Sequence, residues 1–183
     1  MGVISIKSSD NLFWLGRYVE RVFTTLKAFT ECYDIMIDIN DEEYINFCRR
    51  LGIANNYSCR QEFISSFLFD ANDPASIYSS LLHAYDNAVE MRNTISSETL
   101  AYLQLAVDIM EKSSSSNAPL LKVQEVTDWI FAFWGSADDN IESEASRNIL
   151  KFGRVTLLLC QQHPYHILHK LSIIDDKLDF YPL

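Results

Sequence analysis

The sequence has few residues that reverse a chain, with 5 glycines and 4 prolines among 183 residues. These two residue types make up about 5% of the chain, against roughly 12% in average proteins. Because each hairpin of a β-sandwich or barrel needs such residues, the shortage argues against a turn-rich β fold. Hydrophobic residues nevertheless make up 48% and aromatic residues 13% of the chain. That is enough to form a core and excludes intrinsic disorder.

Long apolar runs are also missing. No stretch approaches the roughly 18 apolar residues of a membrane-spanning helix, and the first residues lack the basic and apolar segments of a secretory signal. The cysteines contain no C-x-x-C pair of the kind found in zinc or redox sites, which favours reduced thiols in the cytosol. They are Cys32, Cys48, Cys59 and Cys160. We therefore expect a cytoplasmic protein without a membrane span.

Positive charge is scarce, since 15 Lys and Arg residues face 25 Asp and Glu residues and give a formal net charge of -10. An acidic surface repels phosphate backbones, so we expect no nucleic acid as a partner. One basic patch is predicted, because Arg147, Lys151 and Arg154 share a helical face. We interpret it as surface charge that keeps a helix soluble, in preference to an anion site.

The apolar residues recur at three- and four-residue steps, which predicts helices throughout. The clearest such stripe covers residues 11–39 and includes Leu12, Leu15, Val19 and Leu26. Further helices are expected over residues 43–51, 60–70, 74–92, 96–112, 119–134, 136–161 and 164–170, with a loop over 113–117. Residues 1–183 are thus predicted to form one all-α domain, a helical bundle of mostly antiparallel long helices with a few short ones.

Helix starts and aromatic residues allow further predictions. Ser9 or Asp10 is the expected N-cap of the first helix, because a short oxygen acceptor satisfies free amide groups. Asp73 is expected to cap the fourth helix, with Pro74 at its first position. Five aromatic residues at helical spacing are assigned to the core instead of a stacking surface. They are Trp14, Trp129, Phe131, Phe133 and Trp134.

Two glycines lie inside predicted helices, each directly before an arginine: Gly16 before Arg17, and Gly153 before Arg154. A glycine within a helix costs roughly 1 kcal/mol relative to alanine, so close packing against another backbone is the expected compensation. Arg17, Glu20 and Arg21 are predicted to lie opposite the apolar stripe, where a solvated face of charged pairs is the simplest interpretation.

Arg92 falls on the apolar face of the predicted helix 74–92. An unpaired buried charge is very costly, so its side chain must either extend to solvent or meet a carboxylate. Glu20 and Glu98 are the candidate partners, and both alternatives stay open at the sequence level.

No common catalytic motif is present. The sequence lacks G-x-S-x-G, H-E-x-x-H and a glycine-rich phosphate loop, so it is not itself a P-loop or ATP-grasp enzyme. His163, His166 and His169 could share a metal by spacing, but without a Glu-x-x-His partner we interpret them as structural or surface residues. We therefore expect no metal and no cofactor.

Three blocks of this sequence carry a resemblance to a known family. The segment Asp10-Asn11-Leu12-Phe13-Trp14-Leu15-Gly16-Arg17-Tyr18-Val19-Glu20-Arg21 is similar to E-N-L-Y-W-L-G-R-Y-x-E-R, the signature of the bacterial alpha-E family, of which this chain resembles a short form. Asp86-Asn87-Ala88, Arg92 and Ile95-Ser96-Ser97-Glu98 resemble a middle motif, and Leu150-Lys151-Phe152-Gly153-Arg154 resembles a later one. Asp10 replaces the usual Glu, and no second Glu-Arg follows Arg154.

The resemblance implies a helical protein that acts alongside a circularly permuted ATP-grasp ligase in ATP-dependent peptide or amide-bond synthesis or modification. The first hypothesis is a non-catalytic scaffold that contacts this ligase or forms a homo-oligomer. The alternative is an enzyme of the same pathway, with Arg17, Arg21 and Arg154 around Glu20 in a cleft that binds and activates a carboxylate or phosphate. The residues expected to form the binding or structural polar network are Asn11, Arg17, Glu20, Arg21, Asp86, Asn87, Arg92, Glu98 and Arg154.

Overall fold

A computed structural model describes residues 4–113 and 119–162, with side chains as far as residue 158. In these residues eight α-helices and no strand are present, which confirms the all-α prediction. The helices are α1 (Ile6–Asp38), α2 (Glu43–Leu51), α3 (Arg60–Phe69), α4 (Ile77–Glu90), α5 (Arg92–Ile95), α6 (Ser97–Lys112), α7 (Pro119–Asn140) and α8 (Glu144–Gln162).

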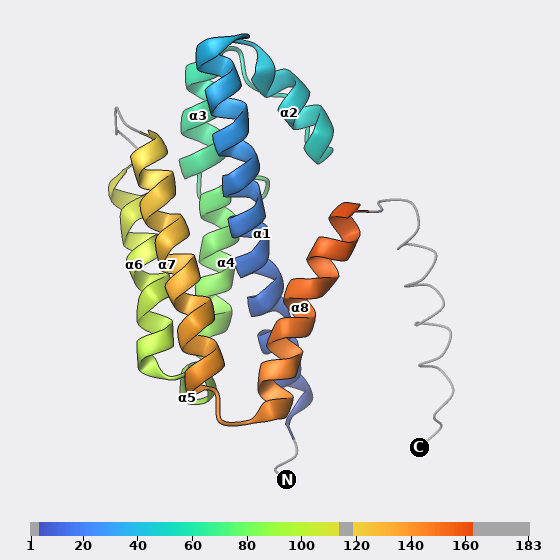
Figure 1. Cartoon of the computed structure of the whole chain (residues 1–183), viewed down its shortest axis with the longest axis vertical. Helices are drawn as coiled ribbons and strands as arrows, with labels where there is room; N and C mark the ends of the chain where they lie inside the picture. The colour runs from blue at the N-terminus through green and yellow to red at the C-terminus, as the bar shows by residue number, and fades with distance from the viewer. Residues whose placement is uncertain (1–3, 114–118, 163–183) are drawn as a thin grey trace, which may run out of the picture.

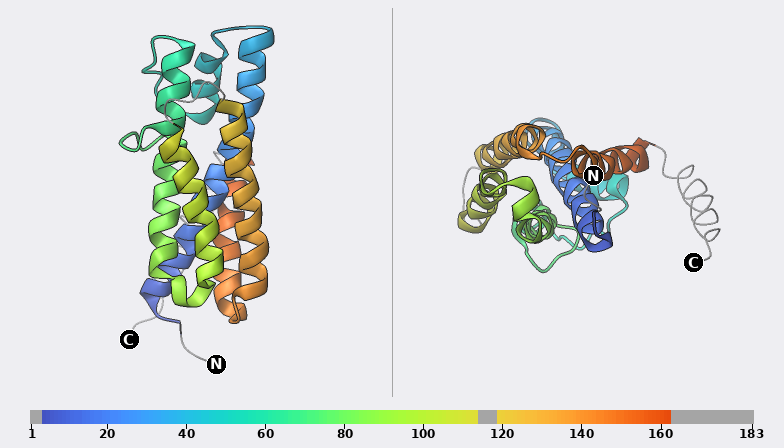
Figure 2. Two further views of the ribbon diagram at one scale, coloured as in Figure 1. Left: turned by 90° about the vertical axis from the view of Figure 1, so that its left-hand side faces the viewer. Right: turned by 90° about the horizontal axis from the view of Figure 1, so that it is seen from below.

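The 33-residue helix α1 is the centre of the arrangement, because it contacts α4, α7 and α8. Helices α4, α6 and α7 run alternately down and up along one side of α1, and α6 contacts both α4 and α7. Helix α8 lies on the other side of α1 and runs beside it in the same general direction (Figures 1 and 2). The short helices α2 and α3 lie at the end of the bundle where α1 ends (Figure 1).

The core follows the apolar stripe of α1. Leu12, Leu15, Val19 and Leu26 are completely buried, as their spacing predicts. Around the carboxyl-terminal half of α1 the core becomes aromatic. The Phe67 ring stacks on those of Phe29 and Phe63, which are tilted to each other, and Phe47 packs edge-on against Phe63 and Phe67. Bulky rings buried in this way give the short helices α2 and α3 their anchorage.

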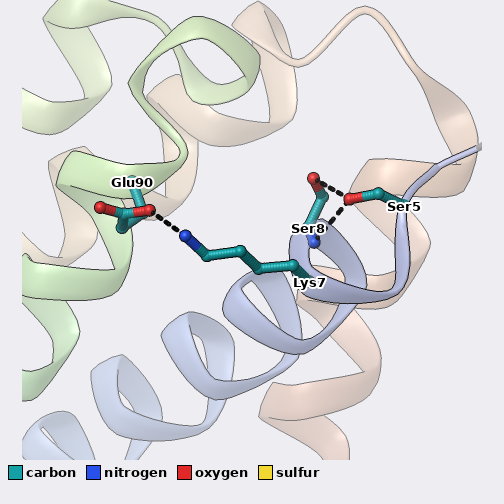
Figure 3. Close-up of polar contacts among 4 residues, drawn as sticks. All are labelled: Ser5, Lys7, Ser8 and Glu90. Atoms are coloured by element: carbon teal, nitrogen blue, oxygen red, sulfur yellow. Dashed lines mark hydrogen bonds and ion pairs between the residues drawn. The ribbon is translucent and has the colours of Figure 1, made fainter.

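The helix starts lie elsewhere than the sequence suggests. Helix α1 begins earlier, at Ile6, because the Ser5 side chain accepts a hydrogen bond from the Ser8 amide. In the same turn, Lys7 Nζ lies 2.8 Å from Glu90 Oε2, so the start of α1 is joined to the end of α4 (Figure 3). Neither Ser9 nor Asp10 is therefore the N-cap; both lie inside the helix.

Helix α4 begins at Ile77, and Ser76 is its cap because its side chain accepts from the Ser79 amide at 3.0 Å. Asp73 accepts from the Ala75 amide at 2.8 Å and so belongs to a turn before the helix. The prediction of Asp73 as the cap, with Pro74 at the first helical position, is wrong. The Ser76 hydroxyl also donates to the Asp70 carbonyl at 2.5 Å, which fixes the cap on both sides.

Helix α7 does not end near residue 134 as predicted, but continues through Gly135 and Ser136 to Asn140. Ser136 supports this continuation, because its hydroxyl lies 2.7 Å from the Thr99 hydroxyl of α6 and accepts from Asn140 Nδ2. Tertiary contacts therefore override the weak helix propensity of the glycine. The expected helix 164–170 and the three histidines His163, His166 and His169 lie outside the described residues.

None of the described helices is both long enough and apolar enough to cross a membrane.

Candidate functional site

Helices α1 and α8 touch backbone to backbone at Gly16 and Gly153. A Cβ atom on Gly16 would overlap the Leu150 carbonyl oxygen, and one on Gly153 would overlap the Phe13 carbonyl oxygen. Both overlaps are with main-chain atoms, which no side-chain rotation can relieve. The expectation that these glycines allow close packing is confirmed. The α8 backbone leaves no room for a side chain at Gly16, and the α1 backbone leaves none at Gly153.

An ion pair lies next to this crossing. Arg154 of α8 places Nε 2.7 Å from Oε2 of Glu20, whose residue is only 2% exposed. The Arg154 guanidinium also lies 4.6 Å from the centre of the Trp134 ring of α7, a cation–π distance. Glu20 is thus not part of a solvated face, as the sequence interpretation had it, but closes a buried junction of α1, α7 and α8.

The electrostatics of Glu20 are set by its burial. Loss of water raises the pKa of its carboxyl group above the ordinary 4.5, although the Arg154 charge and, more weakly, the Lys27 charge oppose this rise. Oε2 is close to Arg154 but makes no hydrogen bond of good geometry within the described residues, and neither does the buried Nε1 of Trp134. The pair is therefore held by charge and packing, and its carboxylate has lost its solvation.

Arg21 points to a different neighbour. Its Nη2 atom donates to the Pro74 carbonyl at 3.2 Å, just before α4. Successive residues on an α-helix differ in direction by 100°, so Glu20 can face α8 while Arg21 faces α4. Two adjacent side chains thereby join the central helix to both of its main neighbours.

Aromatic side chains cover the side of α1 that remains open between α4 and α8. The Trp14 ring centre lies 5.5 Å from that of Phe13 and 5.8 Å from that of Tyr18. Phe152 of α8 continues this row beyond Phe13, at 5.9 Å, and His83 of α4 continues it beyond Tyr18, at 5.1 Å. Trp14 is 44% and Phe152 60% exposed.

A model of the family described as "a predicted alpha-helical domain with a conserved ER motif", Alpha-E, matches residues 5–156. The chain belongs to the Alpha-E family. No curated protein and no solved structure matches it significantly. The only Glu-Arg dipeptide in the sequence is Glu20-Arg21, so the family's ER motif coincides with the two residues that join α1 to α8 and to α4.

The structure places the other expected Alpha-E site residues apart from this junction. Arg17 lies 6.0 Å from the Trp14 ring, on the open side of α1. Arg92 is exposed at the start of α5 and forms no ion pair with any described residue, so neither Glu20 nor Glu98 is its partner. Of the two alternatives for Arg92, extension to solvent is the one that the structure shows. Its assignment to the helix 74–92 was wrong, because α4 ends at Glu90, two residues earlier.

The remaining members of the expected network make local contacts only. The Glu98 carboxylate accepts from the Tyr102 hydroxyl at 3.4 Å, one turn along α6. The Asn87 amide donates to the His83 carbonyl at 2.7 Å within α4. Asn11 is half-buried and Asp86 exposed, and neither side chain has an interhelical hydrogen bond in the described part of the chain. The nine expected residues therefore do not form one network.

The three basic residues of the patch predicted on α8 each contact a neighbouring group, and two of them form ion pairs. Lys151 Nζ lies 2.6 Å from Asp138 Oδ1 of α7, Arg154 is paired with Glu20, and Arg147 donates to the Ile141 carbonyl. All three groups face the neighbouring helix and its loop. The interpretation as surface charge that keeps a helix soluble is thus corrected to a row of contacts that join α8 to α7, to the loop before α8 and, through Arg154, to α1.

The middle motif supplies a helix start. Ser96 has φ 77° and ψ 155°, which is the one positive φ of a non-glycine residue in the described chain. Its hydroxyl accepts from the Thr99 amide at 3.2 Å and caps α6. A serine in this backbone region is strained, so the cap and the sharp turn after α5 are maintained by the surrounding packing.

Two further predictions concern metal binding and the aromatic residues assigned to the core. Among the described residues no group of three or more His, Cys, Asp and Glu side chains could hold a metal ion. Of the aromatic residues assigned to the core, Phe133 is buried, whereas Trp14 and Phe131 are 44% and 57% exposed. The sequence interpretation missed the aromatic surface because ring spacing on a helix is the same for a buried and an open face.

Proposed function

We propose that this Alpha-E chain is a non-catalytic helical scaffold that acts with a circularly permuted ATP-grasp ligase in ATP-dependent peptide or amide-bond synthesis or modification. The observation that carries the proposal is that Glu20, the acidic residue of the candidate site, is buried in an ion pair between helices. Its carboxylate is 2% exposed and occupied by Arg154, so it holds helices together instead of facing a cleft. Membership of the Alpha-E family supplies the expected context.

The enzyme alternative has less geometric support. It requires Arg17, Arg21 and Arg154 to surround Glu20 in one cleft. Arg154 alone reaches Glu20, whereas Arg21 reaches the Pro74 carbonyl and Arg17 lies beside Trp14 on the open side of α1. Two grooves, one between α1 and α7 and one between α6 and α7, are lined by none of these arginines. Arg21 lines a small hollow between α1 and the start of α4, and neither Glu20 nor another of the three arginines lines it.

The test is co-purification with the ligase expected beside it. The tagged chain and the untagged ligase are expressed together, captured through the tag and separated by size, with a second, unrelated ATP-grasp enzyme as the control for specificity. We expect the ligase to co-elute at a constant ratio and its substrate-dependent ATP turnover to change when the scaffold is left out. Failure to capture the ligase, together with unchanged turnover, would contradict the proposal.

The same preparation tests the alternative. The chain purified alone is incubated with ATP and with the substrates on which the ligase acts. If it turns over any of them, and if Arg17→Gln abolishes this turnover without lowering the melting temperature, the enzyme hypothesis replaces the scaffold.

A further inference from the structure

The open side of α1 carries a surface that we name the aromatic–arginine face. It consists of Phe13, Trp14, Arg17, Tyr18 and Arg21 of α1 together with Phe152 of α8. The five α1 residues occupy one stripe of the helix, since they are separated by three, four or five positions or are neighbours across it. Exposed aromatic residues and arginines are the residue types enriched in the centres of protein interfaces.

The two arginines of this face have no acidic partner among the described residues, as is also true of Lys27, Arg49, Arg92 and Arg147. Among the described residues, Arg17 has the Trp14 ring beside it and Arg21 has the Pro74 carbonyl, and neither forms an ion pair with a carboxylate. Elsewhere in this part of the chain, seven basic side chains do form such pairs. They are Lys7, Arg50, Arg60, Lys112, Lys122, Lys151 and Arg154. Among the six unpaired basic residues of the described chain, Arg17 and Arg21 are the two that lie one turn apart on the same helix, and their joint positive charge is complementary to an external acid.

The spacing of the arginines indicates what kind of acid fits. Arg17 and Arg21 are four residues apart, so they lie on the same side of α1 and are separated by about 6 Å along its axis. Carboxylates four residues apart on another helix have the same separation. Apolar residues on that helix would cover Trp14 and Phe152 and remove water from the charged pairs, which strengthens them.

We propose that the aromatic–arginine face docks an acidic amphipathic helix of a partner protein, with two carboxylates one turn apart paired to Arg17 and Arg21. The proposal rests on the scaffold function, in which the partner is the ligase. An anionic membrane or a nucleic acid is disfavoured because such an extended polyanion would meet much of the acidic surface of this chain of net charge -10, whereas a short helix meets only the two arginines and their aromatic neighbours.

The test uses two synthetic helical peptides. The first is a stapled, leucine-containing helix of about 18 residues with two Glu residues four positions apart on its leucine side. The second has Lys in place of both Glu residues. Binding is followed by fluorescence polarisation at low and high salt. We expect the Glu peptide to bind the chain roughly 10-fold more tightly, with the difference falling as salt screens the charges.

A charge exchange gives the decisive comparison. The double variant Arg17→Glu/Arg21→Glu should reverse the preference and bind the Lys peptide more tightly. The matched variant Arg49→Glu/Lys112→Glu, at exposed positions on α2 and α6, changes the net charge equally and should leave the preference unchanged. Should the first variant lose its helical circular dichroism, Arg17→Gln/Arg21→Gln takes its place, with loss of the preference as the expected result.

Three outcomes would overturn the docking proposal: equal binding of both peptides, a preference that survives the charge exchange, or binding of anionic vesicles or RNA without binding of the Glu peptide. A ligase that co-purifies equally with wild type and with Arg17→Glu/Arg21→Glu would also reject this face while leaving the scaffold function intact. Conversely, a chain that prefers the Glu peptide but captures no ligase keeps the face and loses the proposed partner.

Discussion

Replacing Gly16 by alanine adds a single methyl group at the closest point between α1 and α8. The new Cβ would overlap the Leu150 carbonyl oxygen, with the carbonyl carbon 3.0 Å away and the Arg154 nitrogen 3.3 Å away. Because all three atoms belong to the backbone of α8, the helices themselves must separate. Overpacking of this kind costs about 1–3 kcal/mol, and a contact with rigid main chain belongs at the upper end of that range.

The alanine also has a favourable effect, because it raises helix propensity by about 1 kcal/mol relative to glycine. The net expectation for Gly16→Ala is therefore a loss of about 2 kcal/mol in the free energy of unfolding. Gly135 provides a matched control inside α7, since a Cβ there would meet nothing within 4 Å. Gly135→Ala should gain the propensity alone, about 1 kcal/mol.

The measurement is thermal unfolding followed by circular dichroism at the helical band. In a chain of this length 1 kcal/mol shifts the melting temperature by about 2–4 °C, so Gly16→Ala should melt about 4–8 °C lower and Gly135→Ala about 2–4 °C higher. Gly153→Ala should resemble Gly16→Ala, and the double variant should lose less than the sum, because one separation of the helices accommodates both methyl groups. A melting temperature of Gly16→Ala at or above that of wild type would refute the reasoning.

Further predictions concern the ion pair and the strained cap. Arg154→Ala leaves the buried Glu20 carboxylate unpaired and should lower the free energy of unfolding in urea by about 2–3 kcal/mol. This is below the usual value of about 3–5 kcal/mol for a broken buried pair, because the Arg154 side chain is 38% exposed. Adding Glu20→Gln should recover most of the lost stability. Burial raises the pKa of the Glu20 carboxyl group, so the folded chain holds this proton more tightly than the unfolded chain does. The stability gained from the bound proton is complete below the ordinary pKa of 4.5 and is lost as the pH rises through the raised pKa of the folded chain. Wild type should therefore lose stability relative to Glu20→Gln between pH 4 and pH 7, and a constant difference would contradict this. At Ser96, glycine should be at least as stable as serine because it relieves the positive φ, whereas alanine keeps the strain, loses the cap and should cost about 1 kcal/mol or more.

The fold was largely predictable because helical periodicity records which side of each helix meets the core. Leu12, Leu15 and Val19 are buried as their spacing requires. Periodicity weakens at helix ends, where single hydrogen bonds decide. Ser76 caps α4 in place of Asp73 because the Ser76 hydroxyl accepts from the Ser79 amide. Serine and aspartate are both common N-caps, so the sequence alone does not decide between Ser76 and Asp73.

The sequence predicted single residues of the site, but not which residues from distant segments contact each other. A glycine before an arginine inside a helix correctly indicated a backbone contact at Gly16, since the energetic cost of glycine needs a compensation. The choice of Arg154 as the partner of Glu20 depends on the crossing of α1 and α8, two segments more than 130 residues apart in the sequence. The exposure of Trp14 depends likewise on which side of α1 is left open by its neighbours.

The density of motif residues on α1 follows from its central position. Because α4 and α8 lie on different sides of α1, the sequence of α1 must supply small residues where α8 comes close, charged or hydrogen-bonding side chains that reach its neighbours, and solvent-exposed residues on the side that no helix covers. Gly16 and Glu20 meet α8, and Arg21 meets the start of α4. Once these contacts are fixed, Trp14 and Arg17 are confined to the open side, because each residue advances by 100° around the helix. The contacts of α1 with α4 and α8 therefore also determine where the aromatic–arginine face lies. A change in how α1 packs against these two helices would move the residues to which a partner binds.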